Sequence, residues 1–208
     1  MADSTDGFTF SNNWFAVTAK TIWDGLIPTL QPAKFLEVGS FEGASACYLI
    51  EHTKRDLELH CIDTWEGGIE HQRAGVDMSA VEARFHDNTT LAVRRSPHPV
   101  KIVTHKGRSD DQLAGLLAGG HRDFFDMIYI DGSHYAHDAL SDAVLSFPLL
   151  KVGGHMFFDD YLWKGNGISP DPLNAPKLGV DAFMNVFYHK MRLILSPNAQ
   201  VVARKIAA

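Results

Sequence analysis

Short apolar runs alternate along the chain with longer segments in which apolar residues recur every three or four positions. The runs are rich in β-branched and aromatic residues, which is typical of strands, whereas the longer spacing is typical of helices that bury one face. The predicted strands cover residues 34–38, 57–63, 100–105, 125–131 and 154–159. The predicted helices between them cover residues 44–53, 79–95, 110–117 and 135–150.

This alternation predicts right-handed crossovers between parallel strands. The two ends of the chain depart from it. Residues 12–30 predict an amphipathic helix, so we expect residues 1–30 to form a helical cap. After a predicted helix at about 177–190, the runs 192–195 and 201–205 are separated by a short turn and predict an antiparallel hairpin. The pattern therefore predicts an α/β fold, with a mostly parallel seven-stranded sheet, helices on both faces and a C-terminal hairpin.

Two polar segments that contain glycine fit neither spacing. They are WEGGIEHQRAGVDM at residues 65–78 and WKGNGISPDPLNA at residues 163–175. In an open α/β sheet, the loops that leave the carboxyl ends of the strands line the ligand crevice. We therefore expect residues 64–96 to contain an insertion or lid, and residues 161–176 a lid loop, within a single domain that spans residues 1–208.

Composition and charge narrow the class of protein. A length of 208 residues suits one domain, and a net charge of −6 without a Lys/Arg run gives no indication of a nucleic-acid partner. Cys47 and Cys61 lie in apolar runs, which favours buried thiols in a reducing compartment. The N-terminus lacks the pattern of a signal peptide, and no apolar run reaches membrane-spanning length. We expect a cytoplasmic protein without a membrane partner, and a homodimer is the default expectation for its oligomeric state.

The first predicted strand runs into a glycine-containing turn at residues 37–45, EVGSFEGAS. Gly39 and Gly43 allow a tight turn and a close approach to a ligand, and the helix that follows suits a carboxylate or a phosphate. Such a turn can also be purely structural, and it lacks the GxGxxG pattern of nicotinamide dinucleotide sites. Asp63 ends the second predicted strand, 26 residues after Glu37, where a carboxylate can accept hydrogen bonds from ribose hydroxyls or simply face solvent.

Three aspartates follow the fourth and fifth predicted strands. Asp131 ends one, and Asp159 and Asp160 end the next. Neighbouring strands lie ~4.8 Å apart, so these carboxylates would meet and repel one another. A divalent cation such as Mg²⁺, Ca²⁺ or Mn²⁺ would relieve the repulsion, although paired aspartates at a strand end also occur as caps or in solvent.

With these features, residues 35–160 resemble the small-molecule O-methyltransferases of the catechol type. They resemble more closely the broader family of class I S-adenosylmethionine-dependent methyltransferases, which includes sugar and natural-product enzymes. The resemblance implies a Rossmann-like fold and S-adenosylmethionine as cofactor. It implies a cofactor site made of Glu37, Gly39, Ser40, Phe41, Gly43, Ser45, Asp63, Gly107, Ser109 and Asp131.

Within that site the resemblance gives individual roles. Ser45 would bind the carboxylate of the methionine end, Asp63 would hold the ribose, and Ser109 would flank the adenine and cap the next helix. The family's metal ligands lie 28 and 29 residues after the first one, and Asp131, Asp159 and Asp160 match this spacing. The chain departs from the catechol pattern through a longer segment between Asp63 and residue 100, which leaves its substrate open.

His134 lies three residues after Asp131, where catechol-type relatives carry a general-base lysine. An imidazole titrates near neutrality and can take a proton from an acceptor hydroxyl, although a lone loop histidine can also be a surface or capping residue. We expect His134 and Asp131 to be catalytic, with Asp131 placed between the metal and the cofactor edge. Aromatic and polar residues in the two lid segments are candidates for substrate contacts: Trp65, His71, Tyr161 and Trp163.

The sequence therefore predicts direct transfer of a methyl group to a small-molecule hydroxyl, with a divalent cation assisting. A sugar, a phenol or another natural product fits, and methylation of nitrogen stays open. The main alternative is a metal-independent methyltransferase with His134 as the base. A metal-dependent hydroxylase and a cofactor-binding module without activity are further alternatives.

Overall fold

The computed structural model describes residues 7–68, 71–72, 74–163, 171–195 and 200–208. Parts of the expected cap (residues 1–6), of the two expected lids (69–70, 73 and 164–170) and of the expected hairpin turn (196–199) lie outside the described residues. The strands are β1 (Lys34–Val38), β2 (Leu57–Asp63), β3 (Val100–Lys106), β4 (Phe125–Ile130), β5 (Leu150–Phe158), β6 (Met191–Leu195) and β7 (Val201–Lys205). The helices are α1 (Trp14–Thr18), α2 (Lys20–Leu30), α3 (Ala44–His52), α5 (Met78–Arg95), α6 (Ser109–Ala118), α7 (Ala136–Ser146), η2 (Pro172–Asn174) and α8 (Lys177–Val186).

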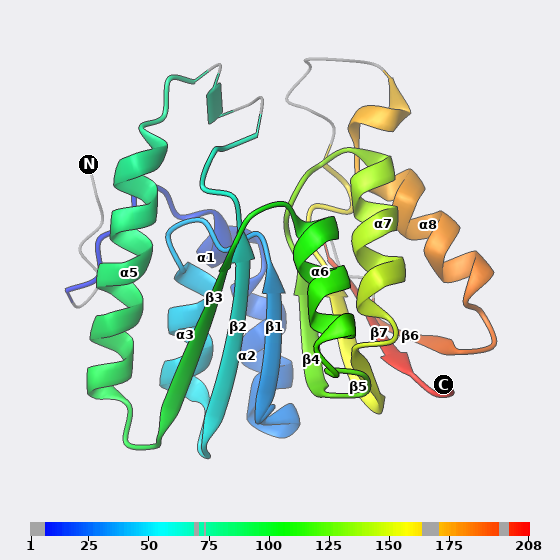
Figure 1. Ribbon diagram of the computed structural model, residues 1–208, viewed down its shortest axis with the longest axis horizontal. Coiled ribbons are helices and arrows are strands. Elements are labelled where there is room, and N and C mark those ends of the chain that lie inside the picture. The colour runs from blue at the N-terminus through cyan, green and yellow to red at the C-terminus, as the bar shows by residue number, and fades with distance from the viewer. Residues whose placement is uncertain (1–6, 69–70, 73, 164–170, 196–199) are drawn as a thin grey trace.

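These strands form one sheet of seven in the order β3-β2-β1-β4-β5-β7-β6 (Figure 1). Strands β1 to β5 are parallel, and β7 pairs antiparallel with both β5 and β6. The predicted mostly parallel sheet with a C-terminal hairpin is confirmed. Strand order reverses between β1 and β4, and ligands of open α/β sheets bind at the carboxyl ends of strands at such a point.

Two apolar cores lie on opposite faces of the sheet, as predicted for a sheet with helices on both sides (Figure 1). In β1, Phe35 packs into the core beneath α2, α3 and α5, whereas Leu36 and Val38 pack into the core beneath α6, α7 and α8. Since successive side chains of a strand point to opposite faces, β1 is buried on both sides. Cys47 and Cys61 are buried free thiols, as expected. Among the described helices, none has the length and apolar composition needed to cross a bilayer.

Some element boundaries differ from the prediction. The N-terminal helix is divided at Ala19 into α1 and α2. Helix α7 ends at Ser146, four residues earlier than expected, because Pro148 has no N–H with which to continue the helical ladder. Strand β5 then begins at Leu150 and passes through Gly153, whose φ is +91°, next to a register shift against β4. A glycine in a strand weakens the apolar pattern, which is why the sequence indicated only the second half of β5.

Candidate active site

The turn between β1 and α3 needs glycine at two positions. Gly39 has φ +86°, and a Cβ there would lie 2.1 Å from the backbone oxygen of Asp131. Gly43 has φ +80°, and a Cβ there would lie 3.1 Å from the side chains of Phe85 and Thr89 in α5. Gly39 thus lets the turn pack against the end of β4, and Gly43 lets α5 pack against the turn.

Asp63 holds this turn from the end of β2. Its Oδ2 accepts hydrogen bonds from the backbone N–H groups of Ser40, at 2.9 Å, and Phe41, at 2.8 Å. Its Oδ1 accepts from the backbone N–H of Trp65 at 2.7 Å. Each carboxylate oxygen has more than one acceptor site, so a ribose hydroxyl can still bind here. The ribose contact of Asp63 stays a prediction, and the structure adds a second role in fixing the turn.

Beneath the turn, the carboxyl group of Glu37 is fully buried and accepts a hydrogen bond from the Ser45 hydroxyl through Oε1. Burial raises the pKa of Glu37 to about 7, and the bond from Ser45 offsets part of that effect. The other oxygen, Oε2, has no partner among the described residues. A buried acceptor without a partner is costly, so this atom fits a ligand that brings a donor, such as the ammonium group at the methionine end of the expected cofactor. Ser45 donates to Glu37, and its predicted contact with the cofactor carboxylate stays a prediction.

The expected adenine side of the site is formed by the turn between β3 and α6. Gly107 has φ +145°, and a Cβ there would lie 2.8 Å from the Gln112 amide nitrogen. Ser109 does not cap α6, contrary to expectation, because the helix begins at Ser109 and the extended Arg108 occupies the cap position without a side-chain hydrogen bond. Asp142 of α7 is buried nearby, and burial raises its pKa to about 7, partly offset by a hydrogen bond from Ser109.

At the ends of β4 and β5, the three predicted aspartates take different environments. Asp159 is buried and accepts a hydrogen bond from the Tyr129 hydroxyl, which also lies 3.1 Å from Asp131 Oδ2. The backbone N–H of Asp160 donates to Asp159 Oδ1 at 2.8 Å. Burial, followed by the charges of Asp159 and Asp160, holds the pKa of Asp131 well above its usual range. Burial, followed by the charge of Asp160, also raises the pKa of Asp159.

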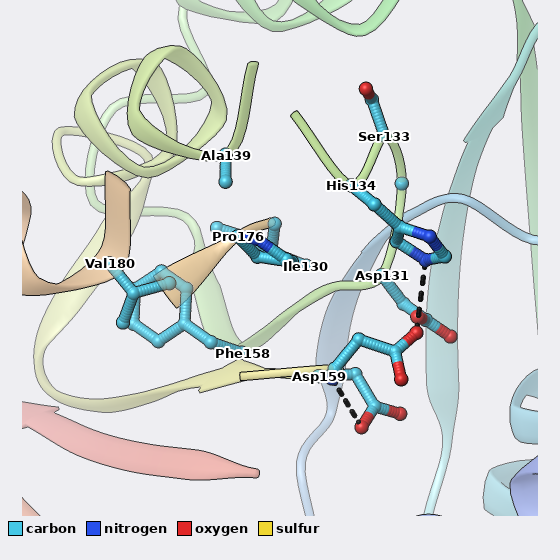
Figure 2. Close-up of a pocket in the computed structure, with 11 residues that line it drawn as sticks. Ile130, Asp131, Ser133, His134, Ala139, Phe158, Asp159, Pro176 and Val180 are labelled. Carbon is cyan, nitrogen blue, oxygen red and sulfur yellow. Dashed lines mark hydrogen bonds and ion pairs between the residues drawn. The ribbon is translucent and has the colours of Figure 1, made fainter. Parts of the chain in front are cut away.

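His134 completes this cluster, and its Nε2 lies 3.0 Å from Asp160 Oδ2 (Figure 2). Among the described residues, the group able to hold a metal ion consists of Asp131, His134 and Asp160, whose ligand atoms lie within 4.8 Å of one another. Asp159, which the spacing predicted as a ligand, lies outside this group and is bonded to Tyr129, and its role as a ligand stays a prediction. Two carboxylates and one imidazole fit a divalent cation.

The cluster opens on a small pocket with two chemically different sides (Figure 2). One side carries the three aspartates with Ser133 and His134. The other side is apolar and is formed by Ile130, Ala139, Phe158, Pro176 and Val180. The indole of Trp163 lies against His134, with ring centroids 4.3 Å apart.

The four predicted substrate residues fall into two groups. Trp163 and His71 lie beside the site, since His71 stacks on Phe41 of the turn with ring centroids 5.1 Å apart. Trp65 is only 4% exposed, donates its indole N–H to the Phe41 oxygen at 2.9 Å and supports the turn. Tyr161 lies outside the pocket lining, and its hydroxyl bonds Asp181 at 2.7 Å and Lys177 at 2.6 Å. The contacts of these four residues with a substrate stay predictions.

Tyr129 is a residue of this region that the sequence analysis did not single out. It lies two positions before Asp131, so the strand alternation places both on one face. The aromatic residues near the N-terminus, Trp14 among them, could enclose an acceptor or pack the N-terminal helix on the sheet. Trp14 of α1 lies 5.5 Å from Phe41 and 5.8 Å from His71 between ring centroids, and its contact with an acceptor stays a prediction.

A family model described as a methyltransferase domain matches residues 36–161, which is more than half of the chain and includes the turn after β1 and all three aspartates. The chain therefore belongs to this family, and the predicted membership of the class I S-adenosylmethionine-dependent methyltransferases is confirmed.

Individual relatives are distant. An uncharacterized protein of Acanthamoeba polyphaga mimivirus is 24% identical over 127 residues, which is 61% of this chain and about half (51%) of the viral protein. The O-methyltransferase TomG of Streptomyces achromogenes, solved with S-adenosylmethionine and involved in tomaymycin synthesis, superposes with a TM-score of 0.63 at 20% identity, over 89% of this chain and 78% of TomG. A putative O-methyltransferase of Klebsiella pneumoniae gives a TM-score of 0.62 at 17% identity, over 91% and 81% of the two chains. These similarities show the fold.

Proposed function

We propose that this protein transfers the methyl group of S-adenosylmethionine to a hydroxyl oxygen of a small molecule bound beside His134, at the carboxyl ends of β4 and β5. The observation that carries the proposal is the pair of His134 and Asp160, 3.0 Å apart, next to Asp131 at the point where strand order reverses. Transfer to oxygen is supported by the similarity to TomG, an O-methyltransferase, and to the Klebsiella pneumoniae protein, a putative O-methyltransferase.

The turn after β1 and Asp63 would hold the cofactor. When bound, S-adenosylmethionine supplies an electrophilic methyl group on its sulfonium centre. Glu37 Oε2, which has no partner in the part of the chain that the structure describes, would accept a hydrogen bond from its ammonium group. Gly39 would let the ligand approach the backbone beside Asp131, and Asp63 would keep the N–H groups of Ser40 and Phe41 in place. Positioning of this kind lowers the barrier because the reacting atoms start close together.

His134 would remove the proton of the acceptor hydroxyl, and Asp160 would orient the imidazole and stabilise its charged form. The indole of Trp163, whose ring centroid lies 4.3 Å from that of His134, would cover the imidazole and the acceptor beside it. An aromatic ring next to three carboxylates suits a phenol, a sugar or another natural-product hydroxyl whose polar atom faces the aspartates.

A divalent cation would be held by Asp131, His134 and Asp160, and when bound it would lower the pKa of the acceptor hydroxyl. The imidazole nitrogen in this set favours Mn²⁺ or another transition metal over Ca²⁺. The same nitrogen of His134 cannot hold a cation and take a proton at once. A metal-independent methyltransferase is therefore the second candidate, and the direct pairing of His134 with Asp160 favours it.

The experiment is calorimetry with S-adenosylmethionine and S-adenosylhomocysteine, followed by an assay for S-adenosylhomocysteine formation with phenols, sugars and natural-product alcohols. We expect micromolar cofactor binding, and loss of turnover by at least about 100-fold in His134→Gln with cofactor affinity unchanged. Loss of turnover in EDTA that Mn²⁺ restores would support the cation, and full turnover in EDTA would support the second candidate. Absence of cofactor binding under all conditions would overturn the proposal.

A further inference from the structure

A segment without regular secondary structure before α1, residues 8–12, lies against both α5 and the turn after β1 (Figure 1). We call it the N-terminal strap. Phe8 anchors it in the apolar core, and the guanidinium of Arg95 in α5 lies 5.3 Å from the centre of the Phe8 ring. No residue of the strap is among those expected to bind the cofactor, although the strap contacts the turn that is expected to do so.

Asn88 of α5 joins the strap to the turn. Its side-chain oxygen accepts from the Thr9 backbone N–H at 2.8 Å, and its side-chain nitrogen donates to the Thr9 backbone oxygen at 3.0 Å. The same nitrogen donates to the backbone oxygen of Glu42, in the turn, at 3.0 Å. Asn88 is 2% exposed. A buried amide that bonds two separate backbone segments fixes their distance, because water cannot replace the lost bonds.

Glu42 makes the second connection. Its carboxylate is buried, and Oε2 accepts from the backbone N–H of Ser11 in the strap at 2.6 Å. Its Oε1 is paired with the guanidinium of Arg84 in α5. Glu42 lies between Phe41, which is bonded to Asp63, and Gly43, which occupies the N-cap position of α3. Any displacement of Glu42 would therefore move the turn that receives the cofactor.

We infer that Asn88 and Glu42 are positioning residues that couple the N-terminal strap to the cofactor turn, so that S-adenosylmethionine binds more tightly when the strap is in place. The coupling is reciprocal, and the bound cofactor must therefore hold the strap more firmly. This inference rests on the cofactor site of the proposed function. It assigns Asn88 and Glu42 no contact with the cofactor and no part in the chemistry.

The test compares Asn88→Ala with Thr90→Ala, an exposed position on the same helix. The affinity for S-adenosylhomocysteine is measured by calorimetry well below the unfolding temperature, and hydrogen exchange of the strap is followed with and without this ligand. We expect about 10-fold weaker binding in Asn88→Ala and wild-type affinity in Thr90→Ala. In the wild-type protein and in Thr90→Ala, saturating ligand should slow exchange at Thr9 and Ser11 more than exchange in the core strand β1, and this extra slowing should be lost in Asn88→Ala. A purely structural role of Asn88 would leave the extra slowing at the strap in place.

Glu42→Gln keeps the shape of the side chain and serves as the second variant if Asn88→Ala does not fold. It is expected to weaken binding in the same direction, because the neutral amide pairs less well with Arg84 and Ser11. Wild-type affinity in the folded variants, or exchange at the strap that ignores the ligand, would overturn the coupling while leaving the proposed function intact. A wild-type protein that does not bind the ligand at all would overturn both.

Discussion

Gly39 and Gly75 both have left-handed backbones, with φ of +86° and +66°, but their surroundings differ. A Cβ at Gly39 would overlap the Asp131 backbone, whereas a Cβ at Gly75 would meet nothing within 4 Å. Gly75→Ala should therefore cost only the backbone strain, about 1 kcal/mol. Gly39→Ala should lower the free energy of unfolding by at least about 3 kcal/mol and abolish cofactor binding, since the turn and β4 must separate. Urea unfolding and calorimetry check both variants, and equal effects would contradict the crowding argument.

Tyr129 offers a second test of a single atom. Its buried hydroxyl donates to the buried Asp159 carboxylate, so Tyr129→Phe removes the donor and leaves the acceptor in place. We expect the free energy of unfolding to fall by about 1–3 kcal/mol at pH 7, because a buried acceptor loses its partner. Tyr188→Phe, at a largely exposed tyrosine, is the control and should change stability by less than about 0.5 kcal/mol. Equal stability of the two variants in urea would show that water reaches Asp159.

At the scale of elements, the strand alternation predicted most of the fold and part of the site. It placed Asp131 and Asp159 at the carboxyl ends of adjacent strands, where they lie. It did not predict that Asp160, with φ +52°, leaves the extended conformation. This left-handed residue pairs with His134, while Asp159 is bonded to Tyr129. Backbone reversals of this kind depend on long-range packing, so spacing alone identified the aspartates but not the partner of each.

A histidine cluster between β2 and β3 makes stability depend on pH. His60 is buried, its Nδ1 lies 3.0 Å from His105 Nε2, and its Nε2 lies 3.2 Å from Glu58. The ring of His121 packs against His60, and Lys34 and Lys101 pair with Glu58. Burial lowers the pKa of His60 to about 4 and also lowers that of His105. The folded protein therefore keeps these imidazoles neutral at a pH at which the unfolded chain binds protons.

As the pH falls from about 6.5 to 4, the unfolded chain gains a proton at His60 that the folded protein does not. The contribution of His60 to the free energy of unfolding is fully present above pH 6.5, and it should fall by up to about 3 kcal/mol between pH 6.5 and pH 4. Urea unfolding at a series of pH values should show a steeper loss for the wild-type protein than for His60→Gln. The comparison is best made above pH 4.5. Below that pH the unfolded chain gains a proton at Glu58, whereas the folded protein, in which the pKa of Glu58 is about 2, does not, so Glu58 adds a loss of stability of its own. Parallel pH profiles of the two proteins would contradict the prediction.

At the scale of the whole molecule, the last strand of the chain, β7, is antiparallel to both of its neighbours, whereas the neighbouring pairs among β1 to β5 are parallel. Strand β7 lies between β5 and β6, and it carries Lys205 into the protein interior at 1% exposure. The ammonium of Lys205 donates to the backbone oxygens of Phe147, at 3.0 Å, and Leu150, at 2.6 Å, and pairs with Asp123 at 3.0 Å. The end of the chain is thereby tied to the turn before β5 and to the loop before β4.

Lys205→Met keeps the aliphatic stem but removes the charge that satisfies the two carbonyls. Asp123 is 47% exposed and regains water, so most of the cost comes from the carbonyls of Phe147 and Leu150. We expect the free energy of unfolding to fall by about 2 kcal/mol, compared with less than about 0.5 kcal/mol for the exposed control Lys54→Met. Cofactor affinity at low temperature should stay unchanged, because β7 pairs with β5 and β6, and β5 and β4 separate it in the sheet from β1 and the turn that follows β1. A loss of affinity without a loss of stability would instead mean that the C-terminal strand acts on the cofactor site through β5 and the aspartates that follow it.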